Sequence, residues 1–173
     1  SEVGKTRRKE IEDDVTPHEK TEMRSCIGSG QWLTGNSRPD GAAAISLVQD
    51  GCPKVKNLIA AQLLLKEMSA IADFCLIFRK IKIDKAVIIV FSDSSWANAV
   101  GHKSQAGFLI LIAEASCLTT QGGRFSLLDW SSFRIRQMVR STLGAEACAC
   151  DKGVDKALYS RIACAEILFG LRA

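Results

Sequence analysis

The chain has 173 residues, of which 47% are hydrophobic and 6% are aromatic, and its formal net charge is +4 at pH 7. This length is enough for one ordinary domain or two small modules with a packed core. No run approaches the roughly 18 apolar residues of a membrane span and the first residues are charged, so we expect an intracellular protein without a membrane partner or secretory signal.

The first 76 residues are predicted to contain a polar tail and a helical module. Residues 1–20 mix charges of both signs without an apolar period, which predicts a flexible charged tail. Apolar side chains then recur at helical spacing throughout residues 21–76. This spacing predicts a short helix over residues 23–33, a second through Ala42–Val48 and a third that begins near Val55.

Residues 84–173 have a different pattern, which begins with strands. The unbroken β-branched and aromatic run Ala86–Phe91 predicts a central strand that is covered on both faces. Gln105–Ile112 and Phe125–Ser131 are the predicted second and third strands. Short stretches containing Gly, Asn and Ser separate the three runs, which favours an antiparallel meander.

The segment from Ser141 to Phe169 predicts one long helix. Gly153 lowers the stability of such a helix by up to about 1 kcal/mol relative to Ala, which predicts a close approach at that position. The apolar residues step by three or four and predict a single stripe that packs on the sheet: Leu143, Ala147, Cys150, Val154, Leu158, Ile162, Ala165 and Phe169. The predicted fold is therefore mixed α/β, a three-stranded antiparallel meander plus a long helix, preceded by a small helical module. A three-stranded sheet that ends in a helix is unfinished, so we expect an exposed edge beside the first strand.

Two acidic residues are candidates for a metal site. Asp93 follows an apolar strand, where a carboxylate is costly unless a divalent metal or a hydrogen bond compensates it. Taken alone, Asp93 is better explained as a residue that caps the turn after the strand. Glu146 lies in the first turns of the long helix, on the rim of the predicted stripe. Its alternative role is to complement the helix dipole.

Basic residues between the third strand and the helix could contact nucleic acid. Arg134, Arg136 and Arg140 would suit phosphate contacts, and an ordinary solvated loop is an equal alternative, because these residues alternate with apolar ones as in an edge strand. Trp96 and Trp130 are predicted to be core residues, because large aromatic side chains on strands usually pack. Four charged residues are predicted to pair on a solvated face of the long helix: Asp151, Lys152, Asp155 and Lys156.

The order of several motifs resembles one family. Ser-Asp-x-x-Trp at 92–96, Asp-Trp-Ser-Ser at 129–132 and Arg-Ser-Thr-x-x-x-Glu at 140–146 resemble the ribonuclease H domain of copia-type retrotransposon Pol polyproteins. Residues 24–29, 34–40 and 52–66 resemble the helical connection between the reverse transcriptase and that domain. The resemblance spans roughly residues 22–169 and implies a ribonuclease H-like fold for residues 84–173, truncated at the C-terminus.

The resemblance also implies an activity, a cofactor and partners. The activity is hydrolysis of the RNA strand of an RNA–DNA hybrid, with two Mg²⁺ ions about 4 Å apart that carboxylates hold. Asp93 matches the first-strand acid and Glu146 the helix acid, so both are expected to be catalytic and to bind metal. The implied partners are the hybrid and the rest of Pol, including the reverse transcriptase, in a cytoplasmic particle or the nucleus. The third acid of the family would follow beyond Ala173, so an inactive remnant and a non-catalytic module that positions nucleic acid are open alternatives.

Overall fold

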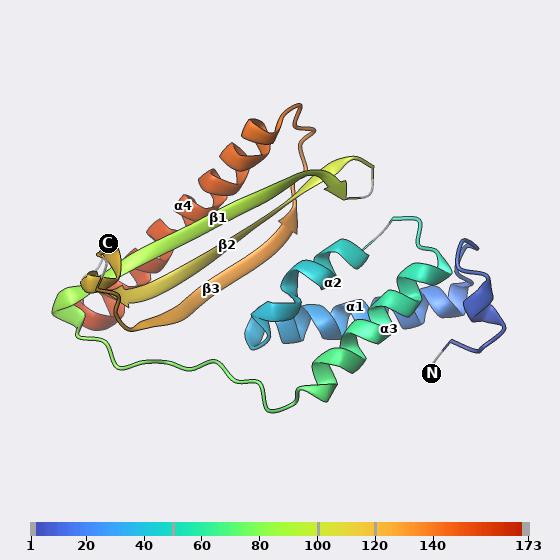
Figure 1. Cartoon of the computed structure of the whole chain (residues 1–173), viewed down its shortest axis with the longest axis horizontal. Helices are drawn as coiled ribbons and strands as arrows, with labels where there is room; N and C mark the ends of the chain where they lie inside the picture. Colours follow the sequence, from blue (N-terminus) through green and yellow to red (C-terminus); the bar gives the residue numbers. More distant parts are fainter. Residues whose placement is uncertain (1–2, 50, 100, 120, 171–173) are drawn as a thin grey trace. The chain divides into compact units, whose positions relative to one another are not determined.

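The computed structural model describes residues 3–49, 51–99, 101–119 and 121–170. The chain divides into two compact units, Ser1–Cys75 and Leu76–Ala173, which are described separately (Figure 1). The first unit is helical, and the second carries a sheet and one long helix. Within the described ranges, no helix combines the length and the hydrophobicity that would let it cross a membrane.

Three helices form the first unit: α1 (Pro17–Asn36), α2 (Ala42–Val48) and α3 (Val55–Ala70). They lie where the spacing of apolar residues predicts them. Helix α1 packs against both α2 and α3. Buried side chains from the N-terminal segment, α1 and α3 form its core: Val3, Met23, Val55 and Leu58.

The segment before α1 has defined contacts, whereas the sequence predicts a flexible tail over residues 1–20. The Arg7 guanidinium donates to both Glu19 carboxylate oxygens, at 2.9 and 3.0 Å, and to Glu10 at 2.9 Å. Glu19 and Thr16 also form a capping box that begins α1. The hydrogen bonds from Arg7 lower the pKa of Glu19 to about 2. The charged residues of this segment, which we expected to be solvated, thus pair with one another and with Glu19 in the first turn of α1.

Arg38, which joins α1 to α2, closes the other end of this unit. Its guanidinium donates to the carbonyl oxygens of Met68 at 2.6 Å and Ile71 at 3.1 Å, at the end of α3. It also forms a two-pronged pair with Asp40, at 3.0 and 2.8 Å. Carbonyls at a helix end have no partner within the helix, so this buried Arg satisfies groups that would otherwise need water.

The second unit is an antiparallel sheet with a helix on one face (Figure 1). Its strands are β1 (Ala86–Ala99), β2 (Lys103–Glu114) and β3 (Phe125–Arg134), in the order β1-β2-β3. Helix α4 (Thr142–Phe169) packs against β1 and β2. The predicted meander followed by a long helix is confirmed. The predicted exposed edge beside the first strand is also confirmed among the described residues, because β1 lies at one end of the sheet. The prediction that this strand is central and covered on both faces is wrong, because its apolar run is only half-buried.

Close contact between α4 and the sheet occurs at Gly153. A Cβ atom at this position would lie 3.2 Å from Val90 Cγ2, 3.4 Å from Ser92 Cβ and 3.5 Å from Phe108 Cβ. The predicted close approach at Gly153 is therefore confirmed. Ser92 pairs with Phe108 in the β1–β2 register, so these neighbours belong to one face of the sheet.

The side of α4 that faces the sheet differs from the prediction. The buried residues of the helix are the small ones, Ala145, Ala149 and Gly153. The predicted apolar stripe is wrong, because its large members are exposed: Leu143 by 79%, Val154 by 43%, Leu158 by 48%, Ile162 by 45% and Phe169 by 61%. Small residues let the helix backbone approach the sheet, and this close packing turns the larger apolar residues outward.

Candidate functional site

Asp93 lies within β1 and not in a turn after it, because β1 continues to Ala99. It pairs with Gly107 of β2, and its side chain is exposed. The carboxylate accepts a hydrogen bond from the backbone N–H of Ser94 at 2.9 Å. Side chains alternate between the faces of a strand, and Val90 and Ser92 face α4. Asp93 therefore points to the opposite face of the sheet.

Glu146 lies in the second turn of α4. The helix begins at Ser141, whose hydroxyl accepts a hydrogen bond from the Gly144 N–H at 3.1 Å. Glu146 is half-buried and follows Ala145, which packs in a cluster with Ala106. At about 100° per residue, Glu146 is on the rim of the buried face of α4.

The Asp93 carboxylate is thus on the sheet face opposite α4, whereas the Glu146 carboxylate belongs to α4 itself. Mg²⁺ prefers near-octahedral oxygen coordination, and a two-metal site needs several converging carboxylates. Over the described ranges, no three His, Cys, Asp or Glu side chains gather closely enough to hold a metal ion. The described residues therefore do not form a complete two-magnesium site, although Asp93 and Glu146 lie on the two elements that the resemblance assigns them.

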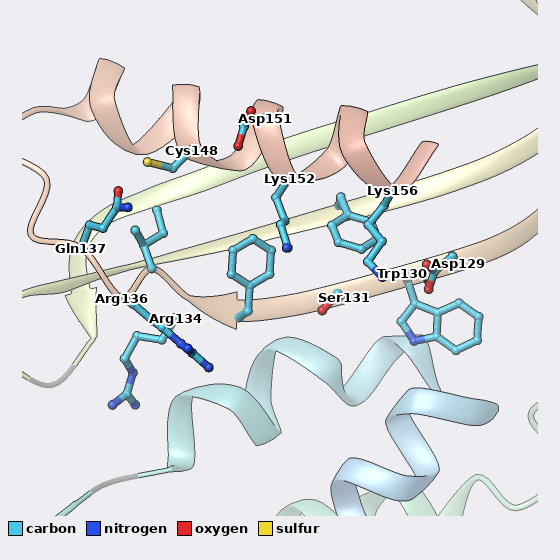
Figure 2. Close-up of a pocket in the computed structure, with 13 residues that line it drawn as sticks. Asp129, Trp130, Ser131, Arg134, Arg136, Gln137, Cys148, Asp151, Lys152 and Lys156 are labelled. Atoms are coloured by element: carbon cyan, nitrogen blue, oxygen red, sulfur yellow. Dashed lines mark hydrogen bonds between the residues drawn. The ribbon is translucent and has the colours of Figure 1, made fainter. Parts of the chain in front are cut away.

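A groove runs between β3 and α4, with a volume of about 680 Å³ (Figure 2). It is lined by two of the predicted basic residues, Arg134 and Arg136. Arg140 is not among its lining residues and immediately precedes the cap of α4. The structure thus brings two of the three arginines to one groove and leaves the third outside it.

Lys152 and Lys156 line the opposite wall of the groove, which the sequence interpretation missed. Figure 2 shows both side chains extending from α4 toward β3, whereas Asp151 points away from the strand. The predicted pairing of these lysines with Asp151 and Asp155 is wrong, because no such ion pair forms among the described residues. The small residues at 145, 149 and 153 are the sequence signal for the buried face of α4. Recognising that face would have placed Lys152 and Lys156 on the flank beside it.

The prediction that Trp96 and Trp130 are core residues is wrong, because neither side chain is buried. Trp96 is 49% exposed, and its indole N–H donates to the carbonyl oxygen of Val139 at 3.1 Å. This bond ties the end of β1 to the segment that precedes α4. Trp130 is half-buried and lines the groove beside Lys156 (Figure 2).

A scan of the chain against protein-family models finds no match, and a search of the solved structures finds no significant match.

Proposed function

We propose that the chain belongs to a copia-type retrotransposon Pol polyprotein and that its second unit is part of a ribonuclease H-like domain. The single observation that carries this proposal is the order of parts in the second unit. A three-stranded antiparallel meander leads directly into a helix on one face, with Asp93 on the first strand and Glu146 early in the helix. These are the elements on which the resemblance requires the two acids.

The proposed substrate is an RNA–DNA hybrid. Arg134 and Arg136 line a groove in the same unit, and cations in a groove suit contacts with a phosphate backbone. Helical duplexes that contain RNA are recognised mainly through backbone shape and 2′-hydroxyls. Recognition is therefore proposed to depend on the kind of duplex and not on its base sequence. The proposed place of action is a cytoplasmic particle or the nucleus, where the rest of Pol, including the reverse transcriptase, acts.

The proposed reaction is Mg²⁺-dependent hydrolysis of the RNA strand. Asp93 and Glu146 would contribute ligands, and at least one further carboxylate is needed beyond what the described residues supply. Asp93 is exposed and Glu146 is half-buried, so neither carboxylate is fully removed from solvent.

A second candidate function is a non-catalytic module that positions nucleic acid for another part of Pol. The orientation of Asp93 favours it, because this side chain lies on the sheet face turned away from α4 and therefore from Glu146. In this case the basic groove remains functional and the acids have structural roles: Asp93 binds its neighbouring N–H, and Glu146 complements the helix dipole.

Incubation of the chain with a labelled hybrid and Mg²⁺ tests both candidates. For a nuclease, Asp93→Asn and Glu146→Gln should abolish cleavage without weakening binding. The matched control Asp155→Asn removes an exposed acid from the same helix and should leave cleavage unchanged. Cleavage that survives Asp93→Asn excludes the assigned site. Because a nuclease needs the further carboxylate, binding without cleavage supports the second candidate when it persists in a chain extended by the segment that supplies this carboxylate. A wild-type chain that does not bind the hybrid refutes both.

A further inference from the structure

We infer that the groove between β3 and α4 binds the phosphate backbone of a nucleic-acid strand through Lys152 and Lys156 on its helix side, with Arg134 and Arg136 lining it at the edge of β3. This inference rests on the proposed function, to which it adds contacts on the flank of α4 opposite Glu146. The lysines are the new element, since they come from a helix flank that the sequence predicts to be an ordinary solvated face.

The positive side chains are regularly spaced along α4 and along the chain at the end of β3. Lys152 and Lys156 are four residues apart on α4, which places them roughly 6 Å apart along the helix axis. Arg134 ends β3 and Arg136 follows two residues later, so the two lie at most roughly 6.6 Å apart along the chain. Between them Ile135 is buried, and its N–H donates to the Ser104 carbonyl oxygen at 2.8 Å. Ile135 packs with Ala145 and Ala149 of α4, so Arg134 and Arg136 project from the side of the chain turned away from α4 and line the groove at its outer edge (Figure 2).

The two lysines of the groove are not paired with the described acids that line it. Asp129 also lines the groove, and its carboxylate accepts a hydrogen bond from the Trp130 N–H at 2.8 Å. Asp151 lines the groove as well, and its side chain points away from β3 (Figure 2). Among the described residues no carboxylate forms an ion pair with Lys152 or Lys156. The Lys156 ammonium lies 5.8 Å from the centre of the Tyr159 ring, a contact that leaves its charge available to an anion.

The chemistry of the lining favours nucleic acid over an acidic peptide. The planar guanidinium fork matches phosphate geometry, and a basic track beside aromatic side chains is the usual surface for nucleotide strands. Here the aromatic residues are Trp130 and Phe133, and Ser131 adds a hydroxyl between them. An acidic peptide would use the cations alone and would gain little from the aromatic wall.

The groove lies on the opposite flank of α4 from Glu146. Lys152 is displaced from Glu146 by six residues, which at 100° per residue puts the two side chains about 120° apart around the helix. A nucleic-acid strand bound by the two lysines therefore lies on a different side of α4 from Glu146. Loss of the lysines should weaken binding and leave untouched any chemical step that depends on Asp93 and Glu146.

The test compares the wild-type chain with the double variant Lys152→Ala/Lys156→Ala. Alanine favours helix, so α4 should be retained, and a thermal melt checks this. The control Lys82→Ala/Lys85→Ala removes two exposed lysines that precede β1 and lie outside the groove. Fluorescence anisotropy at several salt concentrations measures the affinity for a labelled hybrid, single-stranded RNA, duplex DNA and polyglutamate.

The groove variant should bind the hybrid at least about tenfold more weakly at low salt than the wild type. Its slope of log affinity against log salt should fall by about two, one for each lost phosphate contact. The control pair should keep the wild-type slope. An unchanged slope in the groove variant, with hybrid binding intact, overturns the inference and leaves the proposed function standing.

The other probes separate the remaining outcomes. Polyglutamate that binds as tightly as nucleic acid overturns the inference in favour of an acidic peptide. If all nucleic acids bind equally and the groove variant loses slope on each, the inference holds and the hybrid preference of the proposed function fails. A wild-type chain that binds none of them overturns both.

Discussion

Replacement of Gly153 by Val tests the packing on which the groove and the position of Glu146 both depend. Gly153 is buried where α4 crosses β1 and β2, and a Cβ atom there would already lie 3.2 Å from Val90 and 3.4 Å from Ser92. The 3.2 Å contact is tighter than ordinary van der Waals packing, so one added methyl group requires a neighbour to move by a few tenths of an ångström. The two further methyl groups of Val have no space unless the helix moves away from the sheet.

The magnitude follows from two opposing terms. Gly costs about 1 kcal/mol relative to Ala inside a helix, and Val recovers roughly half of this penalty. Overpacking of a tight contact costs about 1–3 kcal/mol. Gly153→Val should therefore destabilise the second unit by about 1–2 kcal/mol. For Gly153→Ala the propensity gain offsets most of the steric cost, so the net change should be close to zero.

Urea unfolding followed by tryptophan fluorescence measures the effect. In a Trp32→Phe background, only the two tryptophans of the second unit, Trp96 and Trp130, report. Ala147→Val is the matched control, because Ala147 is exposed on the same helix and this change carries only the propensity cost of about 0.5 kcal/mol. If Gly153→Val is as stable as the wild type, α4 does not rest on the sheet through its small residues, and the assignment of its flanks fails.

Two further predictions concern stability. Arg7 lowers the pKa of Glu19 to about 2 from an ordinary value of 4.5, so the stabilisation from this carboxylate is present above pH 4.5 and is lost as the pH falls toward 2. Glu19→Gln should lower the urea midpoint of the first unit at pH 7 and match the wild type near pH 2, and an equal deficit at both values would contradict the ion pair. The variant Leu158→Lys/Ile162→Lys should change the free energy of unfolding of the second unit by less than about 0.5 kcal/mol per site, because both side chains are largely exposed. A loss of several kcal/mol would restore the apolar stripe as the buried face.

Local signals were enough to predict most elements of the fold. The second helix is predicted as Ala42–Val48 and is observed with the same bounds, because Pro39 favours a first turn and the residues after Val48 stop the helix. Ser141 likewise caps the long helix where it is expected. These features depend on backbone conformation and on hydrogen bonds within a few residues, which a sequence window contains.

The packing of α4 could not be predicted in the same way. Periodicity of large apolar residues is a good guide when the buried face is the most apolar one. In α4 the helix rests on Ala145, Ala149 and Gly153, and the larger residues face outward. Which face is buried depends on how closely the helix can approach Val90 and Phe108, and this is a property of the sheet. The position of Lys152 and Lys156 in the groove could not be predicted for the same reason, because it depends on which face of α4 packs on the sheet.

The two proposed functions differ in which of two neighbouring residues of β1, Ser92 or Asp93, faces α4. Both acids lie on the elements where the resemblance expects them, but in β1 it is Ser92 that contacts α4, while Asp93 pairs with Gly107 and faces the other way. Because side chains alternate along a strand, a shift of one residue would exchange the two and bring the carboxylate to the side of Glu146. Nucleic-acid binding through the groove is compatible with either phase, so affinity measurements alone do not discriminate between a nuclease and a positioning module. If Asp93→Asn and Glu146→Gln each abolish cleavage, both carboxylates are required for the reaction. This result therefore decides between the nuclease and the positioning module.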